Sequence, residues 1–185
     1  MGQRDCTGSG RPVLEVGLGY TDRTVLLTGA TGYLGSLILE QLFRTCPGVK
    51  KVYVVVRPKR GMTPAARLAA LLRGPVFHLL RARVTDVAAR IGVIEADIEQ
   101  PGFGLSEEQR AELASDVDYI IHCAASIRFD LPVKAVLRAN FTPTRALLDF
   151  ASTLPHLRAF TFMSTAYANA HLPQGSFIEE KIYPL

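Results

Sequence analysis

The sequence predicts an α/β domain built on a doubly wound parallel sheet of about five strands. Short apolar segments alternate with longer helical ones, a pattern that forms right-handed βαβ units. At 185 residues, 48% hydrophobic and 21% charged, the chain can bury one core. A glycine-rich loop follows the first strand, so we expect strand order 3-2-1-4-5 and ligands at the carboxyl ends of the strands.

The elements follow in a regular order. The first strand, 24–28, leads into a helix with apolar positions at Leu34, Leu37, Ile38 and Leu42, which ends near 47–48. We expect strand 51–56, a helical region over 63–89, strand 91–95, helix 106–115, strand 117–122, helix 131–152 and strand 159–163. Residues 1–20 are predicted to be a flexible leader, and 21–185 the domain.

Turn and cap residues support these boundaries. Ser106, followed by Gln109 three residues later, is typical of a capped helix start. Pro132 suits the first turn of its helix, whereas Pro143 lies inside the pattern and should kink or split it.

Three glycines spaced three apart stand where the first strand becomes a helix. In a Rossmann-type dinucleotide site, Gly29 makes the turn, Gly32 lets backbone N–H groups approach a pyrophosphate, and Gly35 lets the helix pack on the strand. We therefore predict cofactor contacts from Thr28, Gly29, Thr31, Gly32, Tyr33, Leu34 and Gly35.

The end of the second strand favours NADPH over NADH. Sites that prefer NADH commonly place an acid there, which binds the ribose 2′-hydroxyl. Here the position is Arg57, followed by Lys59 and Arg60. A guanidinium pairs with a 2′-phosphate, so Arg57 and Arg60 are predicted cofactor ligands. The alternative is that Arg57 only ends an exposed strand.

The ends of the third and fourth strands offer further contacts. Asp97 and Ile98 are placed to reach the adenine, although Asp97 could instead cap a turn. Ala124 and Ala125 are small enough to let the backbone pass close to the cofactor ribose. Small residues are equally common where helices cross sheets.

Composition narrows the partners and the compartment. Eleven Lys or Arg and one acid lie between Arg44 and Arg90, which indicates an anionic partner, although we read Arg67, Arg73 and Arg90 as a solvated basic face. Without interleaved aromatics this stretch does not indicate nucleic acid. The three cysteines fit neither a disulfide framework nor a metal site and favour an intracellular location. No apolar run is long enough for a transmembrane segment.

Several segments together resemble the amino-terminal part of the fatty acyl-CoA reductases, in the extended short-chain dehydrogenase/reductase superfamily. The similarity runs over 22–184. Its segments are Thr28 to Gly35, Arg57-Pro58-Lys59-Arg60-Gly61, Gly74-Pro75-Val76-Phe77, Glu95-Ala96-Asp97-Ile98, His122-Cys123-Ala124-Ala125-Ser126, Asn140 and Ser164-Thr165-Ala166-Tyr167.

The resemblance implies NADPH-dependent reduction of a long-chain acyl-CoA to a fatty alcohol. It implies Ser164 as a catalytic residue, Tyr167 as a residue of the substrate pocket, and Asn140 as a residue that supports the cofactor site. A serine satisfying backbone groups and an ordinary helix-surface asparagine are the alternatives. A peroxisomal or endoplasmic-reticulum location is also implied.

One family feature is missing from the chain. The family pairs a tyrosine with a lysine four positions later, but none of the six tyrosines here is followed by lysine at that spacing. The resemblance therefore implies a sheet incomplete at its C-terminus and a chain that is inactive alone.

Two other functions remain open. One is a thioester reductase domain acting on carrier-protein thioesters, and the other is a non-catalytic dinucleotide-binding module. His122, which ends an apolar strand, is read as a core histidine rather than a catalyst.

Overall fold

A computed structural model describes residues 16–59 and 61–181. Most of the predicted leader, 1–15, lies outside the described residues, as does the predicted cofactor ligand Arg60. The end of the leader segment forms a short helix, α1 (Val16–Gly19). Across the described ranges, no helix combines the length and the apolar character needed to cross a membrane.

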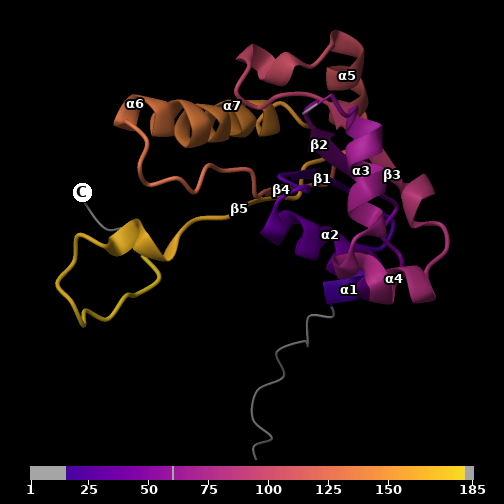
Figure 1. Cartoon of the computed structure of the whole chain (residues 1–185), viewed down its shortest axis with the longest axis horizontal. Coiled ribbons are helices and arrows are strands. Elements are labelled where there is room, and N and C mark those ends of the chain that lie inside the picture. The colour runs from indigo at the N-terminus through magenta and orange to yellow at the C-terminus, as the bar shows by residue number, and fades with distance from the viewer. Residues whose placement is uncertain (1–15, 60, 182–185) are drawn as a thin grey trace, which may run out of the picture.

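Five parallel strands form one sheet in the order β3-β2-β1-β4-β5, which confirms the predicted topology (Figure 1). They are β1 (Thr24–Thr28), β2 (Lys51–Val56), β3 (Ile91–Glu95), β4 (Tyr119–His122) and β5 (Ala159–Phe162). Thr28 is in register with Val55 on one side and His122 on the other, so the carboxyl ends of three neighbouring strands meet at one edge.

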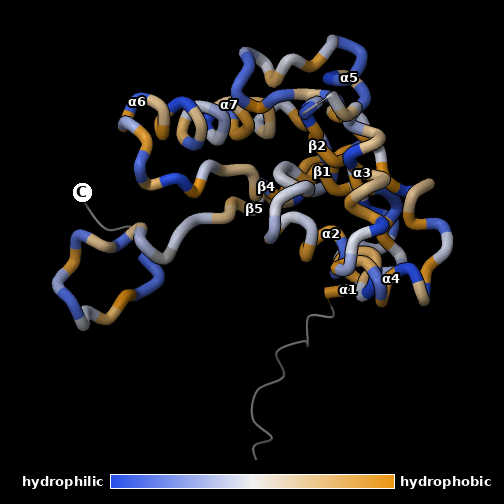
Figure 2. Tube along the Cα trace, viewed as in Figure 1, coloured by the Kyte–Doolittle hydropathy of each residue, from blue (hydrophilic) through white to orange (hydrophobic). Residues whose placement is uncertain are grey.

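Helices cover both faces of the sheet, because successive residues of a strand point to opposite sides. Val25 and Leu27 pack with α2 (Tyr33–Thr45), α3 (Pro64–Arg73) and α4 (His78–Arg83). Leu26 packs with α5 (Glu107–Asp116) and α7 (Thr142–Ala151) on the other face. The apolar residues accordingly gather on the central strands in Figure 2.

The buried face of α2 differs from the prediction. Leu39 and Phe43 are fully buried and Leu42 nearly so, whereas Leu34 and Leu37 are 42% and 37% exposed. The reason is that Gly35 packs against the backbone of Gly29 and Ala30, so the buried stripe continues from it at the spacing of a helix.

The helical region predicted over 63–89 is broken into four pieces. α3 ends at the Gly74-Pro75 pair, because Pro75 cannot continue the hydrogen-bond ladder, and a 3₁₀ turn, η1 (Pro75–Phe77), leads into α4. A second 3₁₀ turn, η2 (Val87–Arg90), precedes β3. By contrast, α5 starts as predicted, with a capping box between Ser106 and Gln109.

The long helix expected over 131–152 runs without a split but changes its winding. α6 (Val133–Val136) passes into a π-helical segment, η4 (Leu137–Phe141), and then into α7. Pro143 sits in the first turn of α7, where the wider π segment before it accommodates a residue with no N–H to donate. Beyond β5, residues 163–181 run away from the sheet with one 3₁₀ turn, η5 (Ala166–Asn169) (Figure 1).

Candidate dinucleotide-binding site

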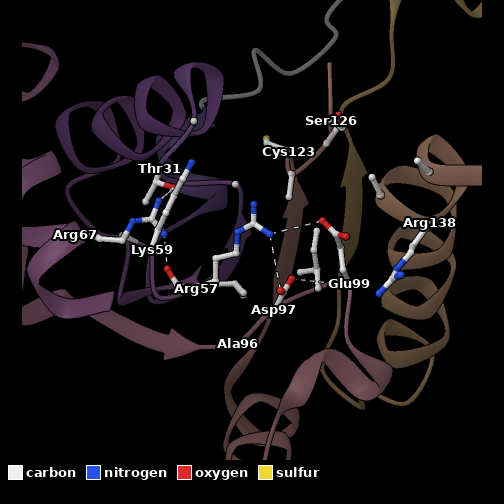
Figure 3. A pocket seen from close by; sticks show the side chains of 18 of the residues that line it. Thr31, Arg57, Lys59, Arg67, Ala96, Asp97, Glu99, Cys123, Ser126 and Arg138 are labelled. Carbon is white, nitrogen blue, oxygen red and sulfur yellow. Dashed lines mark hydrogen bonds and ion pairs between the residues drawn. The ribbon is translucent and has the colours of Figure 1, made fainter. Parts of the chain in front are cut away.

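A cavity of about 660 Å³ opens at the carboxyl edge of the sheet (Figure 3). Its wall is made by the segments that follow β1, β2, β3 and β4, together with the start of the helix that carries η4. This is the place where doubly wound sheets bind ligands, and the volume is that of an ordinary ligand pocket. Of the predicted cofactor residues, it is lined by Gly29, Thr31, Gly32, Arg57, Asp97, Ile98, Ala124 and Ala125.

The glycine loop forms a cradle made of backbone alone. Gly29 has φ +75°, and a Cβ on it would lie 2.7 Å from the backbone nitrogen of Ala124. A Cβ on Gly35 would lie 2.6 Å from the carbonyl carbon of Gly29. Gly32, at the start of α2, is exposed to the cavity. Small residues thus keep the helix N-terminus open to an anion, so the loop fits a pyrophosphate.

Behind the loop, a chain of hydrogen bonds fixes its first residue. Thr144 Oγ1 donates to the carbonyl of Asn140 (2.6 Å), so the contact from His122 Nε2 to Thr144 Oγ1 (3.0 Å) has the imidazole as donor. His122 Nδ1 then accepts from Thr28 Oγ1 at 2.6 Å, and Thr28 Oγ1 accepts from Ala124 N–H at 3.3 Å. The loop, β4 and the helix are therefore joined through a neutral imidazole.

His122 is a satisfied core residue, as predicted. It is 1% exposed, and burial lowers its pKa below the ordinary value, which favours the neutral form. Its ring also stacks on Phe162 of β5, with centroids 5.8 Å apart. Burial likewise raises the pKa of the Cys123 thiol, so Cys123 lines the cavity as a small neutral side chain.

Asn140 holds the loop that follows β4. Its Oδ1 accepts from the backbone N–H of Ser126 at 2.7 Å, and its Nδ2 donates to the carbonyl of Ser126 at 3.0 Å. Asn140 is not itself among the residues that line the cavity. The supporting arrangement expected for this residue is therefore present, through backbone contacts.

Charged side chains divide the outer end of the cavity into two parts. Arg57 Nη1 lies 3.8 Å from Asp97 Oδ2 and 3.6 Å from Glu99 Oε1, so this guanidinium points across the cavity toward two acids (Figure 3). On the opposite side, Arg67 Nη2 donates to Thr31 Oγ1 at 3.1 Å, and its Nη1 donates to the carbonyl of Arg57.

The remaining predicted residues lie outside the cavity wall. Thr28 is buried behind it, Tyr33 and Leu34 are exposed on the first turn of α2, and Gly35 packs against the loop. Ser164 is exposed just beyond β5, and Tyr167 is 69% exposed with its ring edge-on to Phe129. Their roles stay predictions.

Arg67 is the cavity residue that sequence analysis placed on a solvated face. A signal for it was present, because Thr63 caps α3 and Pro64 starts it. A residue in the first turn and a half of a helix that follows β2 lies near the carboxyl end of that strand. Within the described ranges, no group of three or more His, Cys, Asp or Glu is placed to hold a metal ion.

Comparison with known proteins identifies the family. Residues 27–185 match the model of the male sterility protein family, an NAD-binding domain. The chain belongs to this family. Membership of this family supports a nicotinamide dinucleotide as the cofactor.

Curated relatives are fatty acyl-CoA reductases. Fatty acyl-CoA reductase 2 is 41% identical in Mus musculus and 42% in Homo sapiens, and fatty acyl-CoA reductase 1 of Xenopus laevis is 39% identical, each over 165 residues. These matches cover 89% of this chain and 32% of each relative, so the chain spans about a third of their length.

Solved structures with the same fold include several reductase domains. The terminal R domain of the myxalamid PKS-NRPS pathway has a TM-score of 0.65 and 32% identity, covering 79% of this chain and 35% of its own. The reductase domain of a non-ribosomal peptide synthetase from Mycobacterium tuberculosis has a TM-score of 0.67 and 30% identity, covering 86% and 37%. An archaeal thiolation-reductase di-domain, 23% identical, shares the fold with a TM-score of 0.60 over 84% and 32%.

Proposed function

We propose that this chain is the cofactor-binding part of an NADPH-dependent reductase that converts a long-chain acyl-CoA thioester to a fatty alcohol. The observation that carries the proposal is the backbone cradle at Gly29 and Gly35, found in a chain about 40% identical to fatty acyl-CoA reductases. By the same kinship we propose an intracellular site of action, at the peroxisomal or endoplasmic-reticulum membrane.

The preference for NADPH is supported by charge at the end of β2. Arg57, Lys59 and Arg67 all line the cavity there, at the position where NADH sites commonly carry an acid. Guanidinium groups bind a phosphate through paired, charge-assisted hydrogen bonds. The only acids lining the cavity wall within the described ranges, Asp97 and Glu99, come from the segment after β3.

In the proposed reaction, some residues bind the cofactor and Ser164 donates a hydrogen bond to the substrate. Two nicotinamides bound in turn would each supply one hydride: the first would reduce the thioester carbonyl to an aldehyde with release of the CoA thiol, and the second would reduce the aldehyde to the alcohol. The glycine loop holds the pyrophosphate, and the small side chains of Cys123, Ala124 and Ala125 leave room beside it. Ser164 follows β5, where Met163 N–H bonds to the carbonyl of His122. From there, the Ser164 hydroxyl is proposed to donate a hydrogen bond to the substrate oxygen as negative charge develops.

Calorimetric titration tests the cofactor half of this proposal. The folded chain should bind NADPH more tightly than NADH. Gly32→Val should weaken both by about 100-fold or more, because a branched side chain would fill the approach to the backbone N–H groups. A Cβ at Gly32 meets only the Gly29 carbonyl oxygen, at 3.2 Å, so the melting temperature should change little. Unchanged affinity in this variant would exclude the loop from the site.

Loss of nicotinamide absorbance with a long-chain acyl-CoA tests the chemical half. Residues 1–185 alone should show no acyl-CoA-dependent oxidation of NADPH, because the Tyr-x-x-x-Lys pair is absent from them. A longer product that carries the pair should turn over, and Ser164→Ala in it should slow turnover by about 10²- to 10⁴-fold. Robust turnover by the 185-residue chain would place the proton donor elsewhere.

The similarity to reductase domains of peptide synthetases favours one second candidate, a thioester reductase whose acyl group is carried by a protein. At 32% and 30% identity, these domains are less similar to the chain than the acyl-CoA reductases are. Turnover with an acyl group on a carrier protein but none with acyl-CoA would favour this candidate.

A further inference from the structure

Arg57 and Arg67 stand at the same end of the cavity in opposite electrostatic surroundings. The guanidinium of Arg57 lies near the carboxylates of Asp97 and Glu99, so the three side chains together have a net negative charge. Arg67 contacts a hydroxyl and a backbone carbonyl, both neutral, and Lys59 lines the same side of the cavity. Figure 3 shows the two parts side by side, with Arg67, Lys59 and Thr31 on one side and the acids on the other.

Asp97, one of the two acids beside Arg57, is held in place by hydrogen bonds. Asp97 Oδ1 accepts from the N–H of Glu99 at 3.1 Å, and the N–H of Asp97 bonds to the carbonyl of Phe103 at 3.0 Å. Exposed ion pairs of this kind are individually weak, so a phosphate could displace the carboxylates from Arg57. It would then lie next to the carboxylates of Asp97 and Glu99, whose negative charges repel it.

Arg67 and Thr31 have donors to spare. Arg67 uses one hydrogen on each Nη in the contacts described, and a guanidinium carries five N–H donors. Thr31 Oγ1 accepts from Arg67, so its own hydrogen is free to point elsewhere. Thr31 is also part of the phosphate loop, so an anion bound here is close to the rest of the dinucleotide.

We propose that Arg67, with Thr31, is the principal ligand of the cofactor 2′-phosphate, and that Asp97 and Glu99 retain Arg57 on the adenine side. The inference rests on the proposed preference for NADPH and names the residue that produces it. Arg57 then contributes to both dinucleotides alike, whereas Arg67 distinguishes them. Glu99 weakens the phosphorylated cofactor by repulsion.

Titration of NADPH and NADH into the full chain and four variants tests this assignment. Arg67→Gln should weaken NADPH by about 10- to 100-fold, the scale of a lost charge-assisted hydrogen bond, and change NADH by less than about threefold. Arg57→Gln should change both dinucleotides by a similar factor. Arg73→Gln is the matched control, because Arg73 is exposed in the last turn of the same helix and lies outside this cavity.

The opposite charge change gives an independent test. Glu99 is exposed, so Glu99→Gln should leave folding intact and tighten NADPH by about threefold at low salt without affecting NADH. An unchanged ratio of the two affinities would overturn the role given to Glu99.

The outcomes separate the inference from the function beneath it. Equal affinities for NADPH and NADH in the unmodified chain would overturn the proposed cofactor preference, and the inference with it. A preference that survives Arg67→Gln, or an equal loss of both dinucleotides, would overturn the inference alone, because a merely structural Arg67 would affect both. Selective loss of NADPH in Arg57→Gln would return the phosphate to Arg57.

Discussion

The glycine loop after β1 and the carboxyl end of β5 lie at the same end of the parallel sheet, but they are packed differently. Every residue of β1 is buried, and the loop after it lies against the backbone of Cys123 and Ala124, which follow β4. In β5, by contrast, only Phe160 is partly buried, and Phe162 is 48% exposed. The glycine loop is therefore shaped by contacts with its neighbours. The candidate catalytic Ser164, in contrast, is exposed to solvent among the residues that the structure describes.

His122 connects the two regions through a chain of hydrogen bonds on one side and a ring contact on the other. The hydrogen bonds run from Thr28 at the loop through His122 to Thr144, and the helix then reaches the loop after β4 through Asn140. His122 also stacks on Phe162 of β5. Changes at different points of this path should therefore report how firmly each region is held.

The largest contrast in stability should come from Gly35→Val against Ser164→Ala. A Cβ at Gly35 would lie 2.6 Å and 2.9 Å from backbone atoms of Gly29 and Ala30, which cannot move aside as a side chain does. We expect a loss of about 3 kcal/mol or more in the free energy of unfolding. Ser164 is exposed, so Ser164→Ala should stay within about 0.5 kcal/mol.

Urea denaturation of both variants measures this contrast. Gly19→Val is a control for glycine replacement in general, because a Cβ at Gly19 would have no neighbour within 4 Å. A cost at Ser164 equal to that at Gly35 would contradict the view that the two regions differ in packing.

Sequence patterns predicted the parts of this molecule that depend on local spacing. The strand order, the position of the glycine loop and the cap at Ser106 follow from residues close together in the chain. The hydrogen bond between Arg67 and Thr31, 36 residues apart, could not be predicted in the same way, because the cap at Thr63 indicates only that Arg67 lies near the end of β2. The buried face of α2 was misjudged because it begins at Gly35, which contributes no apolar side chain and packs against the backbone of Gly29 and Ala30.

An intermediate effect should follow from Asn140→Ala, which cuts the link between the helix and the loop after β4. The change removes two hydrogen bonds to the backbone of half-buried Ser126. At about 0.5 to 1.5 kcal/mol for each bond, the free energy of unfolding should fall by about 1 to 3 kcal/mol. Thermal and urea unfolding measure it, and Lys134→Ala, an exposed change in the same helix, should be close to neutral. Equal stability of the two variants would mean that the Ser126 loop does not depend on Asn140.

The smallest effect should be a dependence on pH that originates at His122. Burial places its folded-state pKa below the unfolded value, so below about pH 6.5 the unfolded chain binds a proton that the folded chain does not. The stability contributed by the neutral ring is therefore complete above that pH and is lost as the pH falls below it. In the neutral ring Nε2 donates to Thr144, because the Thr144 hydroxyl donates to Asn140, and Nδ1 accepts from Thr28. A proton on Nδ1 would turn this acceptor into a donor that faces the Thr28 hydroxyl, which is itself a donor there.

Unfolding measured between pH 7.5 and 5 should show a loss of about 1 to 2 kcal/mol, bounded by one proton at about 1.4 kcal/mol per pH unit. The contribution of the imidazole is the difference between the unmodified chain and His122→Asn, in which the slope near pH 6 should flatten. If the dependence of the unfolding free energy on pH persists in His122→Asn, another group titrates. The neutral imidazole would then not be the reason that the contacts between the loop and β5 weaken in acid.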